Sequence, residues 1–223
     1  MYLLGQVLSF SLLSMGIESL HGTVVVVDDG AVAFVGDCGY GKSTLGAAML
    51  AKGFPVLTDD LIALRESAAG CVVQPGVPRI KLFPSVARRV FRRKSLGTPM
   101  NPRTSKLVLP LEQHEAVGRP VPLKAIYVLS PPRTPGGARP GRARVRPLAG
   151  REAFLEVIRA AFNLLVLGEE RLASQFRFAN DLAARVPVRR LTYPRDLSRL
   201  PSVCDTVLRD FSSLPAQGTA TAQ

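Results

Sequence analysis

Apolar runs separated by polar turns organise the first third of the chain. Residues 24–27 and 31–35 are continuous apolar runs on either side of Asp28-Asp29-Gly30, which is typical of a hairpin turn. Residues 45–51 are then rich in strong helix formers, and Gly53 is placed where it can end a helix. This pattern predicts a unit of two strands followed by a helix.

Further elements follow from the same kind of pattern. The apolar residues 7–13 have no Lys or Arg before them, as a signal segment would, so we expect an edge strand there. Residues 95–106 are rich in Gly, Pro, Asn and Ser and are expected to form a loop. We expect strands at 54–58, 61–64, 71–74, 107–109, 125–129 and 186–191, and helices at 84–93, 152–166, 169–184 and 200–211.

The order of these elements predicts an α/β fold, with mixed β-sheets in the first half and a more helical second half. A chain of 223 residues suits one domain, which we place at residues 1–212. Residues 131–142 are expected to be a flexible surface loop, and residues 213–223 a disordered tail. No run reaches the ~20 apolar residues of a membrane span, so no membrane partner is expected.

The strongest chemical signal is the sequence Gly-Asp-Cys-Gly-Tyr-Gly-Lys-Ser, which directly follows the apolar run at 31–35. It has the form of a phosphate-binding loop entered from a strand and left through a helix, in which backbone amides surround phosphates. Lys42 is predicted to reach the β- and γ-phosphates of a nucleotide, and Ser43 to offer its hydroxyl to Mg²⁺. The predicted nucleotide-binding residues are Gly36, Asp37, Cys38, Gly39, Tyr40, Gly41, Lys42, Ser43 and Thr44.

A pair of carboxylates forms the second constellation. Asp59 and Asp60 follow the short apolar segment 54–58, and we expect them at the end of a strand. In extended chain their side chains point to opposite sides, so one can hold the metal while the other takes the proton of an acceptor hydroxyl. Ser43 and Asp60 are the predicted metal ligands, although the pattern does not decide between the two carboxylates. Lys42 is expected to be an exposed loop residue whose replacement by Ala leaves the fold intact.

Charge and cysteine content narrow the partners. The net charge is +12, and residues 67–111 contain nine Lys or Arg but no Asp or Glu, a composition that attracts anions. Aromatic residues make up only 6% of the chain and Trp is absent, which argues against a stacking surface for single-stranded nucleic acid. Cys38, Cys71 and Cys204 show no metal or disulfide spacing, as expected of a reduced, cytoplasmic setting.

The segment from Ser19 to Leu64 resembles the catalytic domain of HPr kinase/phosphorylase. The resemblance rests on Ser-Leu-His-Gly at 19–22, the phosphate loop, and Lys-Gly-Phe-Pro-Val-Leu-Thr-Asp-Asp at 52–60. It implies a P-loop kinase fold of the HPr kinase/PEP carboxykinase type, which uses ATP and Mg²⁺. It also implies that His21 lies near the phosphates, alongside Lys42 and the two aspartates, as a catalytic residue.

The chain departs from that family in two ways. We expect a protein without the N-terminal domain of the bifunctional enzyme, and neither the Gly-rich segment linked to phosphorylase action nor its metal-binding Glu is found in these residues. Residues 75–84, with Pro-Gly-Val-Pro-Arg, and residues 186–197 instead resemble the short HPr kinase-like proteins encoded with lasso peptides and other ribosomally made peptides. That likeness implies phosphorylation of a serine in a precursor peptide.

Arg79 and Lys81 are further candidates, because they can clamp a γ-phosphate or a peptide carboxylate. Arg79 is counted both as a catalytic and as a substrate residue, and Lys81 as a substrate residue. The predicted partners are a nucleotide and a serine-containing peptide or small protein, with homo-oligomerisation left open. Three alternatives stay open at this point. They are a kinase of a free small hydroxy metabolite, a basic nucleotide-binding regulator that binds nucleic acid, and a sensor that binds a nucleotide and hydrolyses it slowly.

Overall fold

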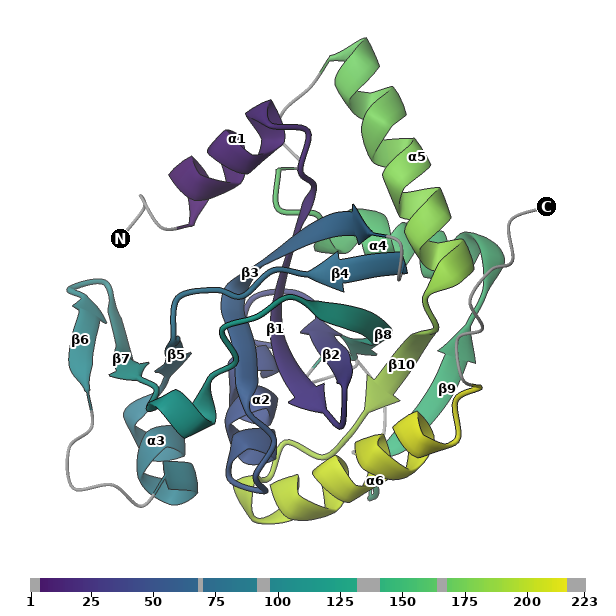
Figure 1. Ribbon diagram of the computed structural model, residues 1–223. Helices are drawn as coiled ribbons and strands as arrows, with labels where there is room; N and C mark the ends of the chain where they lie inside the picture. Colours follow the sequence, from purple (N-terminus) through teal and green to yellow (C-terminus); the bar gives the residue numbers. More distant parts are fainter. Residues whose placement is uncertain (1–4, 68–69, 92–96, 132–140, 164–167, 216–223) are drawn as a thin grey trace.

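The computed structural model describes residues 5–67, 70–91, 97–131, 141–163 and 168–215. It has the expected α/β class, with a seven-stranded sheet, a smaller three-stranded sheet and helices on both sides (Figure 1). The strands of the large sheet are β1 (Ser19–Val27), β2 (Gly30–Val35), β3 (Val56–Ser67), β4 (Gly70–Val73), β8 (Val121–Leu129), β9 (Arg144–Leu148) and β10 (Val188–Thr192). The small sheet contains β5 (Arg79–Leu82), β6 (Thr98–Asn101) and β7 (Thr104–Pro110).

The helices are α1 (Gln6–Ser14), α2 (Lys42–Leu50), α3 (Pro84–Phe91), α4 (Gly150–Ala160), α5 (Glu169–Arg185) and α6 (Leu200–Ser212). Within the described residues, 3₁₀ turns lie at η2 (Gln113–Glu115) and η3 (Leu197–Arg199). Among the described residues, no helix has the length and apolar character needed to cross a bilayer.

The large sheet curls until it closes on itself. Its strand order is β2-β1-β3-β4-β8-β10-β9, and β2 also pairs with β8, so that β8 completes a ring through β4 and β2. The β2–β8 and β8–β10 pairs are parallel and the other pairs of this sheet are antiparallel. The carboxyl ends of β2, β8 and β10 therefore lie together, which is where ligands bind in many open α/β sheets.

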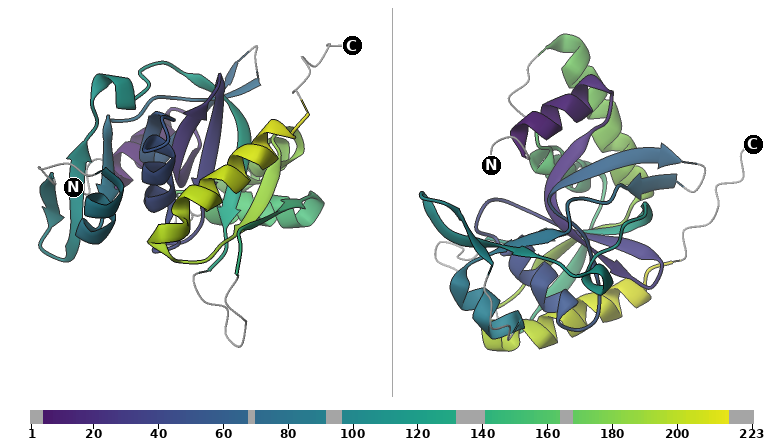
Figure 2. Two further views of the ribbon diagram at one scale, coloured as in Figure 1. Left: turned by 90° about the horizontal axis from the view of Figure 1, so that it is seen from below. Right: turned by 60° about the vertical axis from the view of Figure 1, so that its left-hand side comes forward.

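Both faces of the central strands are buried. Val24, Val26 and Ala33 belong to a core that includes residues of α4 and α5, whereas Val25, Val32 and Phe34 belong to a second core with α2 and α6. Figure 2 shows the helices of the two cores on different sides of these strands. This double burial explains why β1 and β2 are continuous apolar runs rather than alternating ones.

Most of the expected elements are confirmed. The hairpin of β1 and β2 has the expected turn, α2 follows the phosphate-loop sequence, and Gly53 has a left-handed φ of 95° after that helix. The β3–β4 hairpin, α3, α5, β8, β10 and α6 also lie at the expected places, give or take a few residues at their ends. The expected loop at 131–142 and tail at 213–223 fall largely outside the described residues.

The expected edge strand at 7–13 is wrong, because these residues form α1. The segment lacks the alternation of a strand, and Gly16, with φ of 72°, ends the helix by donating its N–H to Leu13 O. Ser9 faces inward, where its hydroxyl donates to Asn163 Oδ1 at 2.9 Å. A buried serine amid exposed apolar neighbours hides the helical period from a sequence reading.

Two other boundaries differ from expectation. Residues 95–106 were expected to be a loop, but β6 and the start of β7 pair there, with Asn101 Oδ1 accepting a bond from the Arg103 N–H in the turn. Proline is tolerated because β6 is an edge strand. The helix expected at 152–166 ends at Ala160, since Phe162 N donates to Ser19 O and extends the chain along β1.

Gly22 of β1 has no space for a side chain, so a substitution at this residue tests the packing around β1. A Cβ on Gly22 would come within 2.6 Å of the Phe34 backbone carbonyl and 2.6 Å of Ile62 Cδ1. We expect Gly22→Ala to lower the free energy of unfolding by about 1–3 kcal/mol, measured by urea denaturation. Gly118→Ala is the matched control, since no atom lies within 4 Å of its added Cβ. Equal stability of the two variants would contradict the packing described here.

Candidate active site

The loop between β2 and α2 is shaped by three glycines. Gly36, Gly39 and Gly41 have φ values of 140°, 82° and 91°, a region that other residues avoid. Gly41 is the N-cap of α2, and no side chain caps the first turn of that helix. The N–H groups of this turn are therefore free of side-chain partners, an arrangement that favours an anion. Asp37, Cys38 and Gly39 are exposed at the loop tip.

Lys42, the first residue of α2, turns back into this loop. Its Nζ donates to the carbonyl oxygens of Gly36 at 2.7 Å and Asp37 at 3.0 Å. The expectation that Lys42 is exposed is wrong, because the residue is only 7% exposed. Burial lowers the pKa of its ammonium group, and the positive charge of Lys106 lowers it further.

Asp59 connects the loop helix to the sheets. Its Oδ1 accepts hydrogen bonds from Thr23 Oγ1 at 2.6 Å and Ser43 Oγ at 2.8 Å, and its Oδ2 accepts one from the Lys81 N–H at 2.9 Å. Desolvation raises the pKa of this carboxyl group in spite of these donors. The close approach of α2 depends on Gly46, where a Cβ would lie 2.5 Å from Thr23 Cγ2.

Asp60 faces a different set of partners. Its Oδ2 accepts a hydrogen bond from Lys81 Nζ at 2.5 Å, and its Oδ1 lies 3.7 Å from His21 Nδ1. The backbone of Asp60 has φ of 89°, which is rare for a residue with a side chain and marks local strain. A Cβ on Gly5, at the start of α1, would lie 3.7 Å from Asp60 Oδ2.

The expected place of the carboxylate pair needs correction. Asp59 and Asp60 lie inside β3, opposite Thr23 and Gly22 of β1, and not at the end of a strand. The strand continues because residues 61–67 pair onward with β1 and β4. Their side chains do diverge as expected, but Ser43 contacts Asp59 rather than Asp60.

His21 is held in one orientation. Its Nδ1 lies 2.9 Å from the Asp60 backbone oxygen, which can only accept, so Nδ1 carries the proton and the neutral ring presents Nε2 as an acceptor. The ring also packs edge-on against Phe162, with centroids 5.6 Å apart. Burial lowers the pKa of His21, and the charge of Lys42 adds to that effect.

Arg79 and Lys81 lie on one face of β5. Ile80 and Leu82 point into the core beneath α2, so the alternation of the strand turns Arg79 and Lys81 to the opposite face. Lys81 reaches Asp60, while its own backbone N–H holds Asp59. The structure thus brings together His21, Lys42, Ser43, Asp59, Asp60 and Lys81, with Arg79 at the edge of the group.

Several contributors were missed in the sequence. Thr23 orients Asp59, and Gly76 gives the segment before β5 room, since its Cβ would lie 2.2 Å from Thr58 Oγ1. The guanidinium of Arg195 donates to the Tyr40 and Ser130 carbonyls and stacks 4.2 Å from the Tyr193 ring. Arg195 thereby holds the phosphate loop in place from outside. The sequence gives no signal for this role, because the two carbonyl partners are 65 and 155 residues away along the chain.

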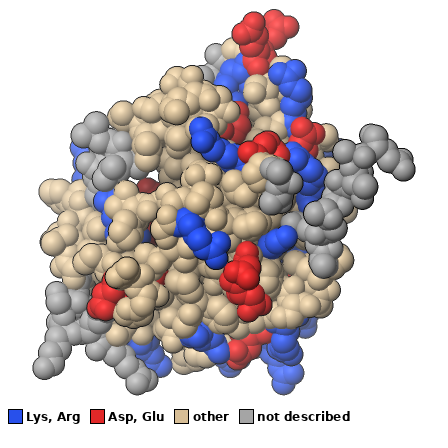
Figure 3. Space-filling model, in the orientation of Figure 1, with Lys and Arg blue, Asp and Glu red and all other residues tan. Residues whose placement is uncertain are grey.

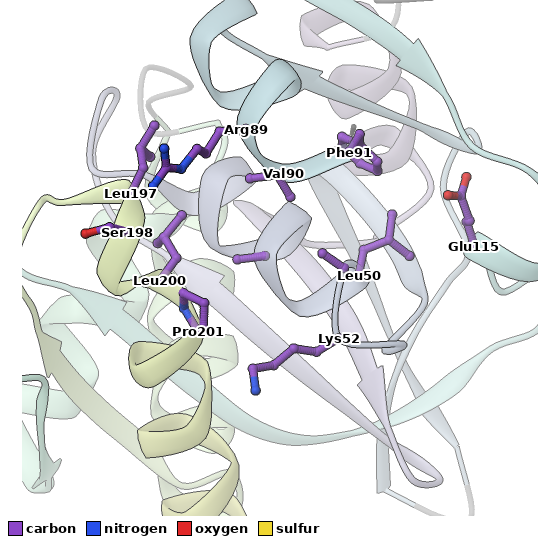
Figure 4. A pocket seen from close by; sticks show the side chains of 12 residues that line it. Leu50, Lys52, Arg89, Val90, Phe91, Glu115, Leu197, Ser198, Leu200 and Pro201 are labelled. Carbon is purple, nitrogen blue, oxygen red and sulfur yellow. The ribbon is translucent and has the colours of Figure 1, made fainter. Parts of the chain in front are cut away.

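One cavity lies away from this site. It has a volume of about 690 Å³ and lies at the opposite end of α2 from the loop, against α3 and the start of α6 (Figure 4). Lys52 on its wall is already paired with Asp205 at 2.6 Å, and Glu115 accepts from the N–H of Glu112. A smaller cavity of about 200 Å³ adjoins the loop itself, beside Gly36, Asp37 and Tyr40, with Glu156 and Arg190 opposite.

Of the comparisons with known proteins, the one with solved structures finds a match. No protein-family model matches the sequence. No curated protein matches it. Among solved structures, the chain is similar to the HPr(Ser) kinase/phosphatase from Coxiella burnetii, at 14% sequence identity and a TM-score of 0.45, over 87% of this chain and 95% of that one. This degree of similarity is too low to assign a shared activity.

The environment of His21 can be tested without any ligand. Because burial and Lys42 lower its pKa below the ordinary 6.5, we expect the ring to titrate below 6.5 in nuclear magnetic resonance spectra. Its ¹⁵N shifts should identify the tautomer protonated at Nδ1. The chain has one other histidine, so His114→Gln assigns the signals.

The sign of the effect on stability follows from this direction. A histidine with a lowered pKa in the folded protein stabilises it above the pKa of the unfolded chain, and that contribution is lost as the pH falls through the folded pKa. His21→Gln should therefore reduce the loss of stability between neutral and mildly acidic pH. A His21 titration above 6.5 would contradict the described burial.

Proposed function

We propose that the protein is an ATP-dependent kinase that transfers the γ-phosphoryl group to a serine hydroxyl of a peptide or small protein. The observation that carries this proposal is the loop–lysine–serine–aspartate arrangement. The uncapped first turn of α2, Lys42 at the loop mouth and the Ser43–Asp59 contact of 2.8 Å form one continuous site. Such a site suits a nucleoside triphosphate better than any neutral ligand.

The donor groups also suit Mg²⁺. Ser43 and Asp59 offer the hydroxyl and carboxylate oxygens that this ion prefers, and Mg²⁺ commonly takes only one or two protein ligands with phosphates and water. No cluster of three or more acidic, His or Cys ligands occurs among the described residues, as a closed protein cage would require. In this proposal Ser43 and Asp59 hold the ion, which neutralises charge on the phosphates.

Each residue then has a separate task. Lys42, whose present partners are two carbonyl groups, exchanges them for phosphate oxygens and stabilises the charge that develops during transfer. Asp60, whose charge is close enough to act on Lys42, accepts the proton of the serine hydroxyl. His21 and Lys81 position Asp60, since both contact its carboxylate or its backbone.

The finer parts of the proposal rest on the sequence. The Pro-Gly-Val-Pro-Arg segment and residues 186–197 resemble the short kinases encoded with lasso peptides, so the proposed acceptor is a precursor peptide. Cys38, Cys71 and Cys204 are free thiols, which suits the proposed cytoplasmic location. A panel of serine peptides with labelled ATP tests the acceptor class directly, with free serine and small hydroxy compounds as the comparison.

Lys42→Met is the first test of the nucleotide site. Methionine keeps the buried stem of the side chain but removes the charge, so the fold should persist. We expect turnover to fall by about a hundredfold to a thousandfold, as when one preorganised donor is lost. Transfer is followed with labelled ATP and binding by calorimetry with Mg²⁺. A variant that retains full transfer activity would refute the assignment of Lys42.

The two aspartates should separate binding from turnover. Asp59→Asn should weaken nucleotide affinity in the presence of Mg²⁺ and leave the weaker metal-free binding little changed. Asp60→Asn should keep that affinity and lower transfer by about a hundredfold to ten-thousandfold, the usual range for a lost general base. The reverse result would exchange the two roles, and unchanged rates in both variants would exclude the pair from the chemistry.

A further inference from the structure

Asp60 lies where the small sheet and the start of α1 come together. Figure 3 shows a hollow on the left of the molecule, on the side where these elements lie in Figure 1. Asp60 is reached from two sides: Lys81 Nζ of β5 contacts its Oδ2 at 2.5 Å, and the start of α1 lies at Gly5. The hollow is therefore bordered by the small sheet and by α1 (Figures 1 and 3).

The wall formed by the small sheet is basic. Val108 of β7 pairs with Lys81 and Pro110 pairs with Arg79, so Lys106, two residues before Val108, lies on the same face as both cations. Lys106 lies 5.3 Å from the centroid of the Phe83 ring and is close enough to Lys42 to lower its pKa. Residues 67–111 themselves contain no Asp or Glu, and Lys81 of this wall is paired with Asp60 of β3.

The α1 border is apolar and carries no charged residue. Val7, Leu8 and Phe10 are 46%, 39% and 49% exposed, while Ser9 between them is fully buried against Asn163. An amphipathic helix normally buries its apolar side chains and exposes its polar ones, because transfer of apolar surface out of water is favourable. In α1 the serine is buried and the phenylalanine is exposed, which is the reverse. This inverted surface begins beside the proposed base, Asp60.

We propose that the hollow binds an extended segment of the acceptor in which acidic residues flank the serine on one side and apolar residues on the other. The inference rests on the proposed function, whose acceptor hydroxyl it delivers to Asp60. Charge complementarity selects the occupant: carboxylates of the segment meet Arg79 and Lys106, and its apolar side chains cover Val7, Leu8 and Phe10. Electrostatic attraction of this kind contributes mainly to specificity and association rate.

The test measures peptide binding without any nucleotide. The probe is a fluorescein-labelled, serine-containing peptide rich in glutamate and leucine. In the first comparison peptide glutamine replaces each glutamate, and in the second serine replaces each leucine. Fluorescence anisotropy should show weaker binding of both comparison peptides. Salt should weaken only the peptides that contain glutamate, because exposed charges are screened beyond about 10 Å at 0.1 M ionic strength.

Variants of the protein identify the two borders. Lys106→Gln should weaken the glutamate peptide about fivefold without affecting the glutamine peptide, and Phe10→Ser should weaken the leucine peptides by a similar factor. Arg209→Gln is the matched control for Lys106→Gln, since Arg209 is an exposed cation on α6. Phe176→Ser is the matched control for Phe10→Ser, since Phe176 on α5 is 55% exposed. Leu8→Gln repeats the α1 test if Phe10→Ser is poorly folded by circular dichroism.

The outcomes separate this inference from the proposed function. Binding of Mg²⁺–ATP by the wild-type protein, measured apart, tests the nucleotide site alone. If ATP binds but the glutamate and glutamine peptides bind equally, or the control variants lose as much affinity as the border variants, the acceptor inference is overturned. It is also overturned if Phe10→Ser dissociates an oligomer in light scattering, because α1 would then contact a second copy of the chain.

Discussion

The half-buried carboxylate of Asp59 is the constraint on which the rest of the site depends. It accepts hydrogen bonds from β1, α2 and β5, through Thr23, Ser43 and the backbone of Lys81. A hydrogen bond to a charged group contributes about 1.5–3 kcal/mol, and a buried charge without partners would be far more costly than any one bond gained. A single side chain thus links the phosphate-loop helix, the central sheet and the small sheet, in addition to the core that they share.

The strained backbone at Asp60 gives its carboxylate a different environment. With φ of 89°, Asp60 lies beside Lys81 and His21 while its neighbour faces Ser43. At the same residue the backbone oxygen of Asp60 accepts a hydrogen bond from His21 Nδ1 at 2.9 Å. Strain at this point therefore has a local use, which is the pattern seen where a backbone outlier lies in a functional site.

Local signals explain what the sequence predicts well. The β1–β2 hairpin, the glycine loop and α2 depend on neighbouring residues, and their boundaries were foreseen because turn chemistry and helix propensity act over short distances. The nature of α1 was missed because Ser9 is buried through Asn163, which is 154 residues away. The early end of α4 has the same origin, since Phe162 pairs with Ser19 of β1.

In the site, too, some features depend on neighbouring residues and others depend on contacts between distant segments. Lys42, Ser43 and the aspartate pair could be named from spacing, but which carboxylate meets Ser43 depends on the register of β1 with β3, where Thr23 is opposite Asp59. The clamp by Arg195 and the basic face shared by Lys81 and Lys106 arise only when distant strands pair. The sequence therefore identifies which reactive residues are present. Which partners these residues contact depends on how distant strands pair in the tertiary structure.

The electrostatics of Lys42 then explain why an anion should complete this arrangement. Lys42 and Lys81 are both buried cations, but Lys81 has a carboxylate partner at 2.5 Å, while the groups that hydrogen-bond Lys42 Nζ are two neutral carbonyls. A desolvated ammonium held by carbonyls alone has its pKa lowered, as Lys42 does, because the protein stabilises its charge incompletely. A phosphate at the open first turn of α2 supplies the missing negative charge, so the resting structure already favours the ligand that the glycine loop can enclose.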